Sequence, residues 1–289
     1  MFSDNKELSL AWEYINRTCE TIFLTGKAGT GKTTFLRNVV KNCHKRLVVV
    51  SPTGVAAINA GGVTVHSFFQ LPFGVCIPMY TYAERKNSFR FTKSKLNIIR
   101  SLELIIIDEV SMLRCDLIDE IDKVLRQLRR STKPFGGVQM LLIGDMQQLS
   151  PVVKPEEWDI LREHYSSPYF FDSQVLRQNN YVAIELRQIY RQKDPEFIHL
   201  LSCVRNSTMD HTLLQQLNSR YIPYFSDAKG EGYITLATHN STCDNINESR
   251  LAQLQQTPFT FKAEIEGTFP TYSYPQSETL VLKKGAQVM

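Results

Sequence analysis

The chain has 289 residues with a formal net charge of +4, and 43% of its residues are hydrophobic and 21% charged. This composition excludes a disordered chain, which would combine low hydrophobicity with high net charge. No apolar run is long enough to span a bilayer, and residues 1–7 contain acidic residues in place of a basic, apolar leader. Six cysteines without C-x-x-C spacing favour reduced thiols over a disulfide framework or a zinc site. We therefore expect a globular protein that is neither secreted nor bound to a membrane.

Short apolar runs rich in β-branched residues alternate with helical patterns along the first 180 residues. The runs occupy residues 21–25, 47–50, 102–107 and 140–143. Such runs are typical of buried strands in a parallel sheet with helical crossovers, so we predict an α/β fold. Residues 116–130 repeat apolar side chains at helical spacing. The arginines at the end of that segment either complement the helix dipole or contact nucleic acid; they are Arg126, Arg129 and Arg130.

Two changes of pattern divide the chain further. From residue 67 to residue 97, prolines and a glycine interrupt the alternation, and aromatic residues are interleaved with basic ones. We interpret residues 67–97 as a small domain inserted into a first α/β domain. That first domain would comprise residues 1–66 and 98–180. A second alternation, with a strand at 181–186, a helix at 195–205 and a strand at 233–238, predicts a second α/β domain over residues 181–289.

The segment from Gly26 to Thr33 matches G-x-x-x-x-G-K-[ST] and lies between a predicted strand and a predicted helix. In that context glycines let backbone N–H groups surround phosphates at the positive end of the helix. Lys32 is expected to reach the β and γ phosphates of ATP, and the Thr33 hydroxyl to bind Mg²⁺. The alternative is a glycine-rich turn without a ligand. The residues predicted to bind the nucleotide are Gly26, Ala28, Gly29, Thr30, Gly31, Lys32, Thr33 and Thr34.

Two further predicted strands end in polar residues. Asp108 and Glu109 directly follow the run at 104–107, at the carboxyl edge of the sheet where open α/β folds bind ligands. We expect Asp108 to bind Mg²⁺ and Glu109 to activate the attacking water, although an Asp-Glu pair can also simply cap a turn. Gln148, shortly after the strand at 140–143, is either a sensor of the γ-phosphate or a solvent-facing glutamine.

Taken together, these segments resemble the Pif (petite integration frequency) helicases and their RecD-like relatives. The similar segments, in matching order and spacing, are residues 26–33, 51–57 (SPTGVAA), 62–68 (GVTVHSF), 107–112 (IDEVSM) and 144–151 (GDMQQLSP). Residues 134–139 (PFGGVQ) resemble the stretch that marks the Pif branch itself. The similarity covers nearly the whole chain, continuing through residues 190–192, 236–240 and 284–289. The segments at 64–68 and 134–139 are its most specific parts.

The resemblance implies a superfamily-one motor with two RecA-like P-loop NTPase domains, which hydrolyses ATP with Mg²⁺ while moving 5′ to 3′ on single-stranded DNA. It also implies that the protein unwinds duplex at single-strand/duplex junctions, near the inserted domain, and is monomeric without DNA. Roles in DNA replication, repair, recombination and telomere maintenance are part of the same expectation. For a bacterial source, the resemblance implies a cytoplasmic protein associated with the nucleoid.

The resemblance also implies roles for individual residues. Arg191 matches an arginine that the second domain offers to the γ-phosphate, acting with Lys32, Glu109 and Gln148; the alternative for Arg191 is a surface cation. The residues that match DNA-contacting segments are Pro52, Thr53, Gly54, Thr64, His66, Ser67 and Phe68. Small residues and hydroxyls can approach a phosphate backbone, and aromatic rings can stack on bases. The alternatives are that Phe68 or Phe69 is a core aromatic, and that the insertion is a hairpin packed on its own aromatics.

The sequence departs from the family pattern at two points. Family members carry a glutamine upstream of the phosphate loop that reads adenine, but no glutamine precedes Gln70 here, so adenine specificity has no support. The chain also stops at Met289, where family members continue, so we expect the second domain to be incomplete. The alternative function is therefore a nucleotide- and single-stranded-DNA-binding module without productive unwinding. A nucleotide kinase or a signalling switch would explain neither residues 64–68 nor the second α/β domain.

Overall fold

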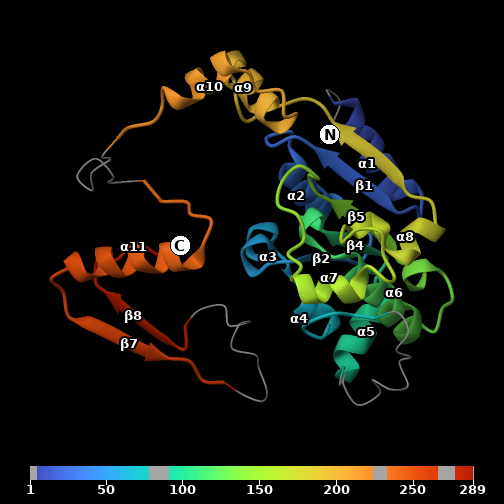
Figure 1. The fold of residues 1–289 in the computed structure, drawn as a ribbon. Coiled ribbons are helices and arrows are strands. Elements are labelled where there is room, and N and C mark those ends of the chain that lie inside the picture. The colour runs from blue at the N-terminus through green and yellow to red at the C-terminus, as the bar shows by residue number, and fades with distance from the viewer. Residues whose placement is uncertain (1–4, 78–90, 224–232, 266–276, 289) are drawn as a thin grey trace. The chain divides into compact units, whose positions relative to one another are not determined.

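A computed structural model describes residues 5–77, 91–223, 233–265 and 277–288. It forms two compact units, Met1–Leu214 and Gln215–Met289 (Figure 1). No helix within the described ranges is long and apolar enough to cross a bilayer. Most of the predicted inserted domain, including the basic residues Arg85, Lys86 and Arg90, lies outside the described residues.

The first unit is built on one parallel sheet. Its strands are β1 (Ile22–Gly26), β2 (Leu47–Ser51), β3 (Val63–Thr64), β4 (Leu104–Ile107), β5 (Gln139–Ile143) and β6 (Val182–Leu186). They are ordered β3-β2-β4-β5-β1-β6, and every neighbouring pair is parallel. Every residue of β4 and β5 is buried, as expected for apolar strands that are covered on both faces. The α/β fold with a parallel sheet is thus confirmed.

Helices precede, connect and follow these strands in the chain. They are α1 (Lys6–Arg17), α2 (Lys32–Asn42), α3 (Gly54–Ala60), α4 (Val65–Phe69), α5 (Lys93–Ser101), α6 (Cys115–Arg129), α7 (Pro155–Leu161), α8 (Gln174–Gln178), α9 (Pro195–Arg205) and α10 (His211–Asn218). Helices α2 to α8 lie between these strands in the chain, α1 precedes β1, and α9 and α10 follow β6, with α10 crossing the boundary between the two units. Short 3-10 helices occur at η1 (Val110–Met112), η2 (Pro134–Gly137) and η3 (Phe170–Asp172).

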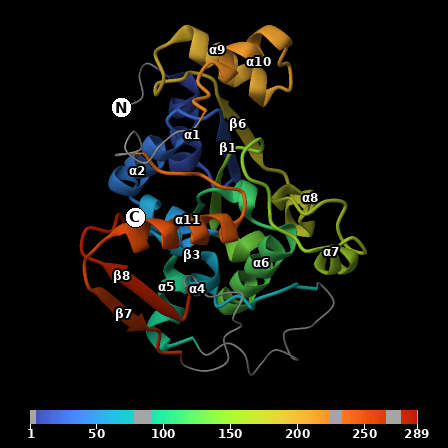
Figure 2. The ribbon, with the colours of Figure 1, turned by 60° about the vertical axis from the view of Figure 1, so that its left-hand side comes forward.

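Alternate residues of β1, β2, β4 and β5 enter two separate cores. Leu24 and Ile106 pack in one core with Phe35 of α2. Ile107, the neighbour of Ile106, packs in the other core with Ile121 of α6. Because successive side chains of a strand point to opposite faces of the sheet, α1 and α2 cover one face while α5 and α6 cover the other. Figure 2 shows α2 and α6 on opposite sides of the sheet.

The first unit extends beyond the predicted domain boundary at residue 180. β6, expected to open a second domain, is instead an edge strand of the first sheet, because all five of its residues pair with β1. Ile184 and Leu186 of β6 also pack in the same core as Leu24 of β1. The first compact unit accordingly ends at Leu214 and not at residue 180.

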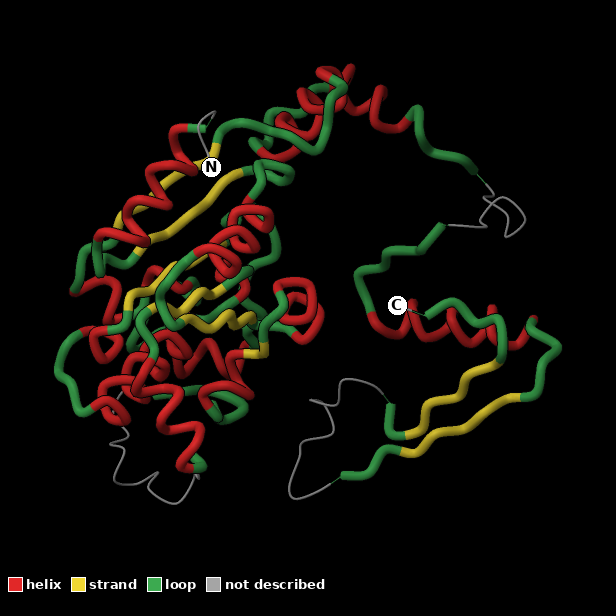
Figure 3. Tube along the Cα trace, turned by 180° about the vertical axis from the view of Figure 1, so that it is seen from behind, coloured by secondary structure: helices red, strands yellow, loops and turns green. Residues whose placement is uncertain are grey.

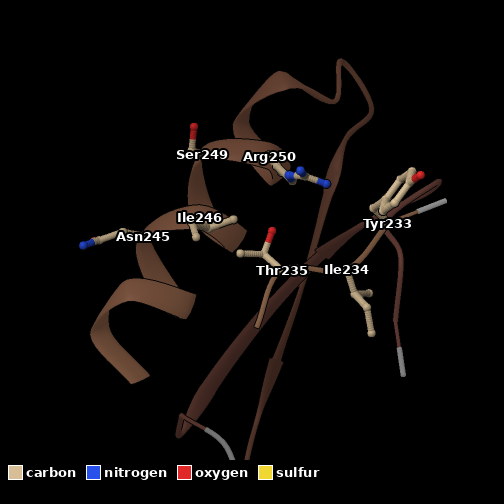
Figure 4. A pocket seen from close by; sticks show the side chains of 7 residues that line it. All are labelled: Tyr233, Ile234, Thr235, Asn245, Ile246, Ser249 and Arg250. Atoms are coloured by element: carbon tan, nitrogen blue, oxygen red, sulfur yellow. The ribbon is translucent and has the colours of Figure 1, made fainter. Parts of the chain in front are cut away.

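The second unit contains α11 (Asn240–Gln253) and an antiparallel pair, β7 (Pro258–Lys262) and β8 (Thr279–Lys283) (Figure 3). Residues 233–238, predicted as a strand, are not assigned to one. The segment 233–235 and α11 line an open cavity (Figure 4), whose residues are Tyr233, Ile234, Thr235, Asn245, Ile246, Ser249 and Arg250. No parallel strand pair occurs among the described residues of this unit, so its RecA-like fold remains a prediction.

The family-specific segment at 134–139 connects α1, α6 and β5. Phe135 is buried, and its N–H donates to the Asp122 carboxylate of α6 at 2.5 Å. Gln139 is buried at the start of β5, where its Nε2 donates to two backbone oxygens at and beyond the end of α1. Its Oε1 accepts a hydrogen bond of 2.7 Å from a lysine that precedes β2. These contacts satisfy polar groups that would otherwise be buried without partners, so the segment has a structural role.

Gly136 offers a test of this packing. Its φ is +62°, and a Cβ there would lie 2.7 Å from the backbone oxygen of Leu125. Gly137 has φ of +80°, but a Cβ there would meet Lys133 only at 3.7 Å. We expect Gly136→Ala to lower the free energy of unfolding by about 3 kcal/mol or more, because left-handed strain and overpacking add. Gly137→Ala should cost about 1–2 kcal/mol, from strain alone. Urea denaturation measures both values, and equal losses would contradict this packing.

Candidate nucleotide-binding site

The loop between β1 and α2 has a conformation that requires glycine. The φ values are +80° at Gly29 and +94° at Gly31, in the left-handed region that other residues rarely adopt. The loop also has no room for side chains at two of its glycines. A Cβ at Gly26 would lie 2.7 Å from the backbone oxygen of Leu186, and one at Gly29 would lie 2.7 Å from the Cβ of Arg191. The predicted phosphate loop is therefore packed tightly against residues at and beyond the end of β6.

The first turn of α2 has the features of an anion site. Its N-cap residue Gly31 supplies no side-chain hydrogen bond, and no acidic residue lies in the first turn. The first N–H groups of a helix have no partner within the helix and carry its positive partial charge, which suits a phosphate. Thr30 is buried, and its hydroxyl donates to the Lys27 carbonyl at 2.8 Å, which closes the loop. The exposed residues at this end are Ala28, Thr33 and Thr34.

Lys32 lies near three carboxylates but bonds to its own loop. Its Nζ donates to the carbonyl of Gly26 at 2.5 Å and to the next carbonyl along the loop at 3.1 Å. Burial lowers the pKa of Lys32, and the charges of Asp145, Glu109 and Asp108 oppose that shift. The carboxyl ends of β4 and β5 therefore bring acidic groups close to the start of α2.

β4 delivers Asp108 and Glu109 to the carboxyl edge of the sheet. The Asp108 N–H donates to the Val50 carbonyl at 2.9 Å, which continues the pairing of β4 with β2. Burial raises the pKa of Asp108 to about 6, and the neighbouring charge of Glu109 adds to the shift. Glu109 has φ of +53°, a strained conformation of the kind that concentrates at functional sites. The predicted acidic pair thus lies in a buried and strained turn.

Oxygen donors at this edge fit a magnesium ion. Within the described residues, no group of three or more His, Cys, Asp or Glu side chains is arranged to hold a metal ion. Mg²⁺ usually keeps several waters and takes one or two carboxylates together with phosphate oxygens. The Asp108 carboxylate and the Thr33 hydroxyl are donors of the right kind and number for such an ion.

A further carboxylate, Asp145, lies just after β5 and is not among the residues predicted from motifs. Its side chain is 1% exposed, and it accepts hydrogen bonds from Gln148 Nε2 at 3.1 Å and from Arg205 Nη1 of α9 at 2.6 Å. Gln148 itself is exposed. The position of Asp145 after a buried strand is the same signal that marks Asp108, and it could have been used. No sequence signal marks Arg205.

Residues after β6 pass along the phosphate loop. The Tyr190 N–H donates to the Gly29 carbonyl at 2.8 Å, which places the adjacent, exposed Arg191 beside the loop. Lys27 Nζ donates to the Ser202 hydroxyl of α9 at 3.2 Å. The family resemblance assigns Arg191 to the second domain, but here it belongs to the first compact unit. Local backbone contacts therefore bring Arg191 to the phosphate loop.

The residues predicted to contact DNA lie at the carboxyl ends of β2 and β3, which pair at Ser51 and Thr64. Thr53 and Thr64 are the N-caps of α3 and α4, and each hydroxyl accepts from the backbone N–H three residues later, at 3.3 and 3.2 Å. At Gly54, which is exposed, a Cβ would meet nothing within 4 Å. The exposed or partly exposed members of the set are Pro52, Thr53, Gly54, Thr64, His66 and Ser67.

Phe68 differs from these residues because its ring is in the core. It is 4% exposed, it packs edge-on against the buried Phe69, and Lys95 Nζ lies 3.7 Å from its ring centre. Both phenylalanines are thus core aromatics, and Phe68 is not an exposed stacking platform for a base. The aromatic pair nearer the surface is His66, which stacks on the half-exposed Phe73 with ring centres 5.6 Å apart. Burial lowers the pKa of His66, and the nearby Arg114 lowers it further.

The parallel sheet, the glycine loop before α2 and the acidic pair after β4 define a P-loop NTPase of the RecA-like class. A model of PIF1-like helicases matches residues 7–213. The chain therefore belongs to the PIF1-like helicase family.

Known relatives are similar over most of the chain. ATP-dependent DNA helicase PIF1 of Homo sapiens is 33% identical over 282 residues, which cover 93% of this chain and 41% of that protein. A structure of DNA unwinding at forked duplex DNA by two coordinating Pif1 helicases has a TM-score of 0.84 at 37% identity, covering 96% of this chain and 64% of that one. Bacteroides Pif1 in complex with ADP-AlF3 and single-stranded DNA has a TM-score of 0.81 at 36% identity, covering 96% and 63%. The chain spans about two fifths of the length of the human relative.

Asp108 provides a test of the cost of burying a charged carboxylate at this edge of the sheet. Because its pKa is raised in the folded protein from 3.8 to about 6, the folded state binds the proton more tightly than the unfolded state. The stability contributed by Asp108 therefore falls as pH rises from about 4 to 6 and stays low above that. We expect Asp108→Asn to raise the free energy of unfolding at pH 7, in metal-free buffer, by about 1–3 kcal/mol.

The gain in the free energy of unfolding from Asp108→Asn should shrink below pH 4, where the parent carboxyl is protonated in both the folded and the unfolded state. Urea denaturation at the two pH values measures it. Asp159→Asn is a matched control, because Asp159 is 62% exposed and forms an exposed pair with Arg162, and it should have little effect. An Asp108→Asn protein that is less stable than the parent at pH 7 would contradict this account.

Proposed function

We propose that the protein is an ATP-dependent DNA helicase that moves 5′ to 3′ along single-stranded DNA and unwinds duplex. The observation that carries the proposal is that one edge of the sheet holds both sets of groups. The phosphate loop and the acidic pair follow β1 and β4. Thr53 follows β2, and Thr64 is the last residue of β3. β2 is adjacent to β4, so a change at the nucleotide can reach a DNA-bound loop through neighbouring strands. The direction of movement is inferred from the family resemblance alone.

The start of α2 is the proposed binding site for the phosphates of ATP. The phosphates would lie against the N–H groups of the first helical turn, and Lys32 would turn from its loop carbonyls toward the β and γ phosphates. Asp108 and the Thr33 hydroxyl would hold Mg²⁺, which neutralises phosphate charge. The relative solved with ADP-AlF3 supports nucleotide use in the family.

Hydrolysis requires groups beyond the phosphate loop. Glu109 would take the proton of the attacking water, and Gln148 would contact that water or the γ-phosphate. Arg191, held beside the loop, would stabilise the negative charge that develops on the γ-phosphate oxygens. Each of these residues follows a different strand of the same sheet, namely β4, β5 and β6, so their spacing depends on the sheet as a whole.

Single-stranded DNA and single-strand/duplex junctions are the proposed partners, bound by a protein that is monomeric without DNA. The hydroxyls of Thr53 and Thr64 accept their cap bonds and keep a donor hydrogen for a phosphate oxygen. The His66–Phe73 pair offers a ring surface for stacking. Contacts of this kind depend on the DNA backbone more than on base sequence, so binding should weaken steeply with salt.

Substitutions at Lys32 and Glu109 should affect nucleotide binding and turnover differently. Lys32→Ala should abolish hydrolysis and weaken ATP binding, because the γ-phosphate loses its cation. Glu109→Gln should retain ATP affinity within about threefold but lower turnover about 10²–10⁴-fold, because the general base is lost. Hydrolysis with single-stranded DNA and equilibrium binding of ATP measure the two effects. The exposed Glu156→Gln is the matched control. Equal turnover in Glu109→Gln and the parent would remove Glu109 from this role.

Substitutions at Thr53 can distinguish its role as a helix cap from its proposed role in DNA binding. Asp is as good an N-cap as Thr, so Thr53→Asp should fold normally while its charge repels the DNA phosphates. We expect single-strand affinity to fall about tenfold or more, a loss of about 1.4 kcal/mol or more, whereas Thr53→Ser should bind like the parent. Thr132→Asp is the charge-matched control, because Thr132 is exposed and precedes β5, at the opposite edge of the sheet. Equal losses in both Asp variants would argue against DNA contact at Thr53.

A further inference from the structure

The buried carboxylate of Asp145 connects two separate parts of the first unit. Its Oδ2 accepts from Arg205 Nη1 at 2.6 Å and from Gln148 Nε2 at 3.1 Å, and its Oδ1 accepts from the Gln147 N–H at 3.2 Å. The side chain of Asp145 is 1% exposed and that of Arg205 is 20% exposed. A buried charge needs a partner to remain ionised, and Arg205 at the end of α9 is the cation in hydrogen-bond contact with it.

The ionised state of Asp145 determines how the Gln148 side chain is oriented. Burial alone would raise the pKa of Asp145, but the hydrogen bond from Arg205 and the N–H of Gln147 outweigh burial and lower it. An ionised carboxylate only accepts hydrogen bonds, so Gln148 must present its amide nitrogen to Asp145. The remaining amide hydrogen and the Oε1 atom are thereby directed away from Asp145.

Asp145 also acts on the phosphate loop through its charge, which opposes the lowering of the Lys32 pKa by burial. The ion pair with Arg205 balances that charge while Lys32 Nζ stays on its loop carbonyls. α9 has a second polar contact with the site, because Ser202, one helical turn before Arg205, accepts a hydrogen bond from Lys27 of the phosphate loop at 3.2 Å. The helix is therefore held against the loop independently of the Arg205–Asp145 pair.

We propose that Arg205 is a positioning residue for ATP hydrolysis, which acts through Asp145 to hold the Gln148 side chain at the γ-phosphate. The inference rests on the proposed function, because it deepens the role given there to Gln148. Arg205 itself touches neither nucleotide nor water in this scheme. Its effect is to fix the one carboxylate oxygen that it shares with Gln148.

The test compares Arg205→Met, Asp145→Asn and the double variant in the whole protein, with ATP hydrolysis and ADP affinity as readouts. Arg205→Met keeps the length of the side chain and removes its charge. Loss of a group that orients a metal ligand typically costs 10–100-fold. By analogy we expect turnover to fall by about that factor while the Kd for ADP stays within about threefold. Because Arg205 acts through Asp145, the double variant should be no slower than the slower single variant. Arg205→Lys, which restores the charge, should recover part of the loss.

Two controls separate positioning from general damage to the fold. Ser202→Ala removes the hydrogen bond between α9 and Lys27, and Arg162→Met removes an arginine from an exposed pair with Asp159. Neither variant should lower turnover more than about threefold. Multiplicative losses in the double variant would overturn the inference. A fall in ADP affinity equal to the fall in turnover would also overturn it, because that pattern indicates a structural role.

The experiment also distinguishes failure of this inference from failure of the proposed helicase function. If the parent protein bound nucleotide without hydrolysing it, the helicase proposal would fail, and the role of Arg205 would be decided by binding alone. The ratio of affinities for ATPγS and ADP should then fall about tenfold in Arg205→Met, because Gln148 would no longer be held at the γ-phosphate. An unchanged ratio would overturn the inference.

Discussion

Parallel pairing of β1 with both β5 and β6 is the constraint on which the candidate site depends. The pairing of Gly26 with Leu186 brings the phosphate loop against the segment that follows β6, so closely that neither Gly26 nor Gly29 has room for a Cβ. On the other side of β1, β5 carries Asp145 to the same edge. The two sheet neighbours of β1 thus determine which residues surround Lys32. Without them, the loop would be a glycine-rich turn with no partner groups.

The same edge carries features that lower stability and are absent from the interior of the sheet. Asp108 is buried with a raised pKa, and Glu109 has a left-handed backbone conformation. Two buried hydroxyls near the strand ends, those of Ser51 and Ser111, have no hydrogen-bond partner among the described residues. Proteins tolerate such features mainly where a ligand or a reaction requires them. Their concentration at the carboxyl edge of the sheet therefore supports a functional site there.

The residue pattern predicts contiguous features well and distant contacts poorly. The glycine loop, the buried strands and the position of Asp108 follow from short stretches of sequence, and the structure contains them. β6 is assigned to the wrong sheet from sequence, because a strand pattern does not indicate which strand it pairs with. The Arg205–Asp145 contact joins residues 60 positions apart, so no local motif reveals it. Phe68 lies in a core whose members come from distant parts of the chain, which spacing alone does not show.

The central claim is that nucleotide and Mg²⁺ bind at the carboxyl edge of this sheet. A crystal structure with Mg²⁺ and ADP-aluminium fluoride tests it most directly. The account predicts phosphate groups at the start of α2, with Lys32 Nζ moved from the Gly26 carbonyl onto them and Mg²⁺ between Thr33 and Asp108. Gln148 should remain bonded to Asp145 and face the fluoride group. A nucleotide bound elsewhere, or a metal without contact to Asp108, would contradict the account.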